Sequence, residues 1–136
     1  MFGPLLLMTL MVVALLMNIR RGGVYLVDFG VKYQSELGKV RPAVVMQSDY
    51  VNDNLDVAPF KSVLVIPLTT DLKGGRFRLP LSKRDALERE SELILNWMCT
   101  VDLARFKEVP MLTMLTQDEL KKLHDKMDFF MGYMDR

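Results

Sequence analysis

Short apolar runs separated by turn-rich segments are the feature that most constrains the fold of this chain. Five runs rich in branched and aromatic residues are predicted to be strands: 24–30, 42–47, 62–70, 76–81 and 93–102. The polar segment 48–61 is predicted to be a loop, and Pro67 is expected at a sheet edge, a bulge or a strand end because it has no N–H to donate. No long helix pattern separates the runs, so we expect an antiparallel, barrel-like sheet.

One helix is predicted, at the C-terminal end. Thr116 and Glu119 have the spacing of a capping box. An apolar stripe then recurs every three or four residues, at Leu120, Leu123, Met127 and Phe130. The predicted fold is therefore mainly β, a small SH3-like antiparallel barrel closed on one side by a C-terminal α-helix.

Residues 1–16 form an apolar N-terminal extension, distinct from a predicted domain over 17–136. The run 5–17 is shorter than the roughly 20 residues of a spanning helix. It follows no basic segment and precedes no small-residue cleavage site, so a secretory signal is disfavoured. A misassigned start codon, with translation beginning at Met17, is the first interpretation, and a short membrane anchor is the second.

Composition excludes several classes of site. The chain has 136 residues, enough for one domain, and a formal charge of +1, which gives no general argument for nucleic-acid binding. One cysteine and one histidine form no His/Cys metal pattern, and the single cysteine suits a reducing cytoplasm. No glycine-rich phosphate loop is present. We therefore expect no metal and no cofactor.

Arg41 is the first candidate site residue. Pro42 follows it and disfavours helical geometry at Arg41, so the guanidinium is aimed from an extended backbone at the start of an apolar strand. Thr69 and Thr70 follow the apolar run "LVIPL". Local basic charge near these positions comes from Lys32, Lys39, Lys73, Arg76 and Arg78, which on composition alone suit an ordinary solvated surface.

Taken together, these motifs resemble the MazF/PemK family of toxin endoribonucleases. The resemblance runs through "IRRGGVYLVDFG", "SELGKVRPAVVMQSD", "VLVIPLTT", "RFRLPL", "LILNWMCTVDLARF" and "TQDELKKL". It covers nearly the whole chain from Met17 onward. Each motif is weak alone, but their order and separation make the resemblance specific.

The resemblance implies a homodimeric, metal-independent enzyme that cuts single-stranded RNA, including mRNA, and that a cognate antitoxin neutralises. It also implies that Arg41 and Thr69 are the catalytic pair. The residue types agree with this chemistry. Arginine presents parallel donors to phosphate oxygens and keeps its charge near pH 7, so Arg41 would stabilise the charged transition state. Thr69 would donate a hydroxyl hydrogen bond to the same phosphate. The residues expected to bind RNA beside this pair are Lys32, Lys39, Thr70, Lys73, Arg76 and Arg78.

The chain departs from the family pattern before Thr100. Many members carry an acid, a glutamine and an arginine where this chain has Asn96, Trp97, Met98 and Cys99. No residue is then evident as the acid or base that transfers the proton, and Glu36 is the nearest candidate. Trp97 is either a stacking platform for a base or a packing residue.

Two alternatives stay open. The departure before Thr100 keeps a catalytically inactive member that only binds RNA or antitoxin under consideration. A gyrase poison of the related CcdB fold is less favoured, because the chain lacks that protein's aromatic C-terminal ending and keeps the Arg-Pro step.

Overall fold

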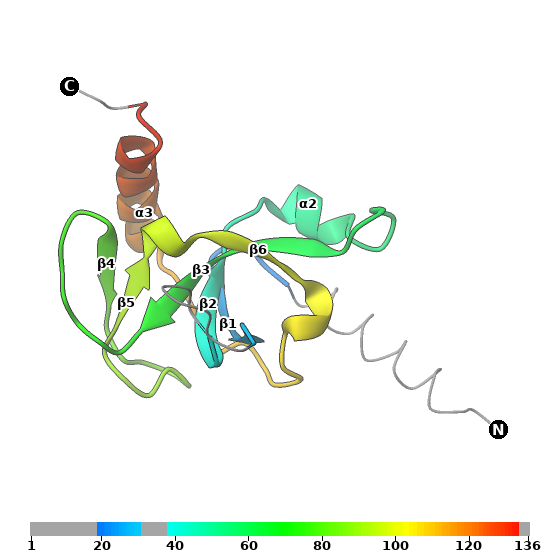
Figure 1. Ribbon diagram of the computed structural model, residues 1–136, viewed down its shortest axis with the longest axis horizontal. Coiled ribbons are helices and arrows are strands. Elements are labelled where there is room, and N and C mark those ends of the chain that lie inside the picture. The colour runs from blue at the N-terminus through cyan, green and yellow to red at the C-terminus, as the bar shows by residue number, and fades with distance from the viewer. Residues whose placement is uncertain (1–18, 31–37, 134–136) are drawn as a thin grey trace.

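The computed structural model describes residues 19–30 and 38–133 and has the predicted class, a mainly antiparallel β fold with one long C-terminal helix (Figure 1). The strands are β1 (Gly23–Asp28), β2 (Val40–Val45), β3 (Ser62–Thr69), β4 (Arg78–Leu81), β5 (Ser91–Ile94), β6 (Cys99–Asp102) and β7 (Thr113–Met114). The helices are α2 (Asp49–Asp53) and α3 (Gln117–Phe130), with 3-10 turns η1 (Leu95–Trp97) and η2 (Leu103–Arg105).

The sheet is built around β3. Its strands follow the order β4-β5-β3-β2-β1-β7, and β6 also pairs with β3. Every pairing is antiparallel. The sheet curves into a half-barrel, and α3 rises from one end of it (Figure 1).

Both faces of the central strands are buried, because successive side chains of a strand point to opposite faces. Val24 and Val44 belong to an apolar cluster that includes Leu123 of α3. Val27 and Val45 belong to a second cluster on the other face, which includes Leu55 and Phe106. This two-sided burial explains why the strands read as nearly continuous apolar runs.

The C-terminal helix follows its prediction at its start and along most of its stripe. The Thr116 hydroxyl accepts from the Glu119 N–H at 3.1 Å, and the Glu119 carboxylate accepts from the Thr116 N–H at 2.8 Å, which completes the capping box. Leu123 is fully buried. Phe130, at the end of the stripe, is 38% exposed and contacts Phe77 instead of the core.

The prediction of a single strand over 93–102 is wrong. Val65 and Leu68 of β3 are three residues apart, but their partners Cys99 and Leu93 are six apart. The chain therefore carries three extra residues between β5 and β6, and η1 accommodates them as a large bulge. Pro67 lies where β3 changes partner from β6 to β5, in agreement with its expected place at a bulge.

The prediction of a loop over 48–61 is also wrong in part, since α2 lies within it. Ser48 caps this helix by accepting from the Val51 N–H, and buried Asn52 bonds to Gln47. A helix of one turn leaves too short an apolar pattern to be recognised in sequence.

Several predictions lie outside the described residues. They are the extension over residues 1–16, Lys32 and Glu36. Within the described ranges, no helix has the length and apolar character required to cross a bilayer.

We expect Leu123→Ala to lower the free energy of unfolding by about 2–5 kcal/mol, because it leaves a cavity between α3 and the sheet. Leu72→Ala is the matched control, since Leu72 is 56% exposed and should change stability by at most about 0.5 kcal/mol. Urea unfolding of both variants measures the difference. Equal midpoints would show that α3 does not anchor the fold.

Candidate functional site

A cleft opens where β2 and β3 separate. The two strands pair up to Ala43 and Pro67, and beyond that point β3 is paired at its other edge, with β5. Counted two residues further along each strand, Arg41 is level with Thr69 across the gap. Residues two apart on a strand share a face, so both side chains lie on the face of Ala43 and Val65. The fold therefore brings the two predicted catalytic residues together.

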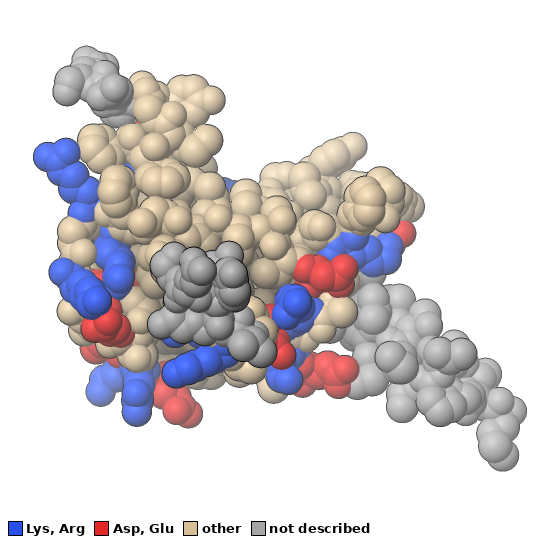
Figure 2. All heavy atoms as spheres, viewed as in Figure 1, with Lys and Arg blue, Asp and Glu red and all other residues tan. Residues whose placement is uncertain are grey.

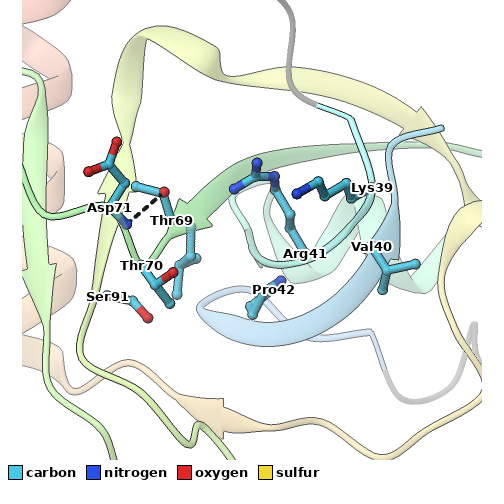
Figure 3. A pocket seen from close by; sticks show the side chains of 9 residues that line it. Lys39, Val40, Arg41, Pro42, Thr69, Thr70, Asp71 and Ser91 are labelled. Atoms are coloured by element: carbon cyan, nitrogen blue, oxygen red, sulfur yellow. Dashed lines mark hydrogen bonds between the residues drawn. The ribbon is translucent and has the colours of Figure 1, made fainter. Parts of the chain in front are cut away.

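The Arg41–Thr69 cleft has a volume of about 360 Å³ (Figure 3). Its lining residues come from the start of β2 and the residue before it, from the end of β3 and the two residues after it, and from β5: Lys39, Val40, Arg41, Pro42, Leu68, Thr69, Thr70, Asp71 and Ser91. Four of the residues predicted for the site, Lys39, Arg41, Thr69 and Thr70, are thus collected in one place.

Arg41 is held by its own turn. Its Nε donates to the carbonyl oxygen of Gly38 at 3.0 Å, and the side chain is half-buried. The guanidinium extends into the cleft toward the end of β3 (Figure 3). The Nε bond fixes the plane of the guanidinium and leaves its two terminal nitrogens to face a ligand. Neither of these nitrogens has a hydrogen-bond partner among the described residues.

Thr69 is buried, with 8% of its surface exposed. Its Oγ1 accepts from the Asp71 N–H at 3.1 Å. A hydroxyl carries one donor and two acceptor positions, so this bond occupies an acceptor position and keeps the O–H for another group. Thr69 is therefore arranged as a donor into the cleft.

Glu92 supports the loop at the rim of the cleft. It pairs with Thr69 across β3 and β5, and it is 6% exposed. Its carboxylate accepts from the N–H groups of Lys73 (2.9 Å) and Gly74 (3.1 Å) and from the guanidinium of Arg78 (3.0 Å). Burial by itself would raise the pKa of Glu92, but these hydrogen bonds and the Arg78 charge outweigh it and lower the pKa.

Of the other predicted RNA-binding residues, those that the structure describes do not line this cleft. Arg78 is committed to Glu92 and to the carbonyl oxygen of Asp71, with 18% of its side chain exposed. Arg76 lies over the ring of Phe129 at 5.3 Å. Lys73 is exposed and pairs with Asp71, and Trp97 is half-buried in η1. The basic cluster around Gly74 and Gly75 thus mainly organises the loop and its contact with α3.

Sequence reasoning missed Asp71, Ser91 and Glu92. The available signal was Glu92 itself, a carboxylate directly before the apolar run "LIL", which requires partners if it is buried. Its partners could not be named without the pairing of β4 with β5.

The residues that depart from the family pattern lie away from the cleft. Asn96 and Trp97 belong to η1, Met98 packs against the cluster that includes Leu123, and Cys99 packs against the opposite cluster. Among the described residues, no group of three His, Cys, Asp or Glu side chains could hold a metal ion.

Charge on the surface is mixed. In the view of Figure 2, Lys and Arg side chains gather along one edge with Asp and Glu between them, and the area over β6 is largely uncharged. On the described part of this face the basic side chains form no continuous surface.

Comparison with known proteins gives a consistent result. Residues 20–131 match the model of the family described as the PemK-like, MazF-like toxin of type II toxin–antitoxin systems. The chain is 31% identical over 117 residues to Endoribonuclease MazF of Staphylococcus epidermidis, covering 84% of this chain and 92% of that protein.

Solved structures share the fold. MazF from Deinococcus radiodurans has a TM-score of 0.65 at 19% identity, covering 83% of this chain and 96% of that one. An endoribonuclease from a mycobacterial species, solved with its cognate antitoxin, has a TM-score of 0.64 at 17% identity, covering 83% and 94%.

We expect the stabilising effect of Glu92 to depend on pH. A folded-state pKa below the ordinary carboxyl value stabilises the protein above that ordinary value, and the effect is lost as the pH falls through the folded pKa. Glu92→Gln should therefore lower the free energy of unfolding by about 1–3 kcal/mol at pH 7 and by less at pH 3, below the ordinary carboxyl pKa. Glu90→Gln is the control, because it makes the same change at an exposed position. A Glu92→Gln deficit that is equal at both pH values would contradict the ionised role.

Proposed function

Because the chain belongs to the PemK-like, MazF-like toxin family of type II toxin–antitoxin systems, we propose that it is the toxin of such a pair and cuts single-stranded RNA, including mRNA. The observation that carries this proposal is the meeting of Arg41 and Thr69 in one cleft. Cleavage is proposed to be sequence-specific, metal-independent and cytoplasmic.

The 2′-hydroxyl next to the scissile phosphate is the nucleophile in this mechanism. It attacks phosphorus, the bond to the 5′-oxygen breaks, and a 2′,3′-cyclic phosphate and a 5′-hydroxyl result. Negative charge gathers on the phosphate oxygens in the transition state. The terminal nitrogens of Arg41 and the hydroxyl of Thr69 donate to those oxygens from fixed positions, which lowers the barrier without reorganisation.

Lys39 adds charge at the mouth of the same cleft. It adopts a left-handed backbone with φ of 72°, which is uncommon for a residue with a side chain. Its N–H and carbonyl oxygen bond to Gly30 and Phe29, so the strained residue closes the turn between β1 and β2. Glu36, which the sequence suggested for proton transfer, remains the candidate acid or base.

A cognate antitoxin and a second copy of the chain are the proposed partners. Support comes from the similar mycobacterial endoribonuclease, which was solved with its antitoxin.

Arg41→Ala should lower the single-turnover rate of RNA cleavage by about 10²–10³, because one preorganised donor to the transition state is lost. RNA affinity should fall only a few-fold, as one phosphate contact is removed. Arg41→Lys should restore part of the rate, since a point charge cannot reproduce the two parallel donors. Equilibrium binding of a 2′-deoxy substrate separates affinity from rate.

The matched control is Arg105→Ala, which removes an exposed guanidinium outside the cleft. It should cut RNA at a rate close to that of the wild type. If Arg41→Ala also cuts at the wild-type rate on saturating RNA, Arg41 is only part of the binding surface.

Cleavage should persist in EDTA and should leave 2′,3′-cyclic phosphate ends or their opened products. The physical reason is that both proposed donors to the phosphate are protein side chains. Mass spectrometry of the fragments identifies the ends. Loss of activity in EDTA together with 5′-phosphate products would refute this mechanism.

A further inference from the structure

A second cleft adjoins the Arg41–Thr69 cleft. It has a volume of about 580 Å³ and shares three lining residues with the first: Pro42, Thr70 and Ser91. The two clefts are therefore neighbours on the surface. A ligand held at Arg41 by a phosphate reaches the second cleft by passing these three residues.

The walls of the second cleft are fixed by hydrogen bonds. The Ala86 N–H donates to the Leu112 carbonyl oxygen at 3.0 Å, which joins the β4–β5 connection to the segment before β7. The Leu112 N–H donates to the Val24 carbonyl oxygen at 2.8 Å. Arg84 forms two bonds of 2.6 Å with Glu119 of α3. The cleft is thus preformed in the folded chain.

Its lining combines apolar side chains with a few charged and polar ones. Leu26, Leu112 and Met111 supply apolar walls, and Met111 is 38% exposed although it is a large apolar side chain. Glu88 and Arg89 contribute exposed charged groups to the same lining. A preformed apolar cleft with a few polar groups is typical of sites for flat, partly polar ligands.

We propose that this cleft binds the base of a nucleotide that adjoins the scissile phosphate and selects among bases, an inference that rests on the proposed RNA cleavage. A base lies within one nucleotide of the phosphate that its ribose carries, so a phosphate at Arg41 brings a base to the adjoining cleft. The apolar walls cover the faces of the base. The Glu88 carboxylate accepts from base amino groups, and the Arg89 guanidinium donates to base oxygen or nitrogen acceptors.

Ala86→Leu tests the proposal by filling the cleft from an exposed position. A random-sequence single-stranded RNA pool is cut by the wild type and the variant, and sequencing of the fragments gives the base preference at each position around the cut. The variant should lose about ten-fold in preference at one position next to the cut and keep the others. Ala104→Leu makes the same change on exposed η2, outside both clefts, and should keep every preference.

Glu88→Gln is the second variant, and its exposed position protects folding. It should change the ratio of amino-bearing bases to uracil at the same position by about ten-fold. Unchanged preferences at every position in both variants would overturn the proposal. Unchanged base preferences together with weaker binding of a protein partner would assign the cleft to that partner. This result would also overturn the proposal.

A failure of the proposed function gives a different result. If the wild type cuts no RNA, binding of uncleavable 2′-O-methyl homopolymers of A, C, G and U still tests the cleft. The wild type should then distinguish the four polymers by about ten-fold, and Ala86→Leu should bind them with more similar affinities. Equal affinities in the wild type would overturn the cleft assignment.

Discussion

The antiparallel register of β2 on β3 is the constraint on which the rest of this structure depends. It aligns Ala43 with Pro67 and, by extension, Arg41 with Thr69. A slip of one residue would turn every side chain of β2 to the other face of the sheet and would move Arg41 away from the cleft. Burial of both faces of β2 opposes such a slip, because Val44 and Val45 each fill a separate apolar cluster. The stability of the core therefore fixes the geometry of the site.

The change of partner along β3 creates the space that this register would otherwise close. β3 pairs with β6 over its first half and with β5 at its end, while β2 separates beyond Pro67. Glu92 of β5 then stands beside Thr69 and holds the loop that begins at Asp71. Thr69 thus receives support from two directions, its own strand and the loop that follows, and neither requires a basic surface. A formal charge of +1 supplies little broad field, so the proposed catalysis relies on donors fixed in place.

The parts of the site that were predictable from sequence are those encoded by neighbouring residues. Pro42 restricts Arg41 directly, and Thr69 follows an apolar run that ends the strand. Glu92 was missed because its partners Lys73, Gly74 and Arg78 are 14 to 19 residues away and meet it only through the folding of β4 against β5. The single strand expected over 93–102 failed for the same kind of reason. Its apolar pattern is continuous, and only the register on β3 reveals the three extra residues.

The role of each cation was equally hidden in the sequence. Arg41, Arg76 and Arg78 are the same residue type near turns, yet one faces the cleft, one lies over Phe129 and one neutralises Glu92. The residues that depart from the family pattern also differ from one another in their surroundings. Met98 and Cys99 fill opposite apolar clusters beside η1, so their identity is tied to packing on the two faces of the sheet. The groups that define the cleft come from the ends of β2, β3 and β5, and the chain retains them. The altered residues 96–99 line neither cleft, so the inactive alternative turns on the missing proton-transfer group and not on the two donors.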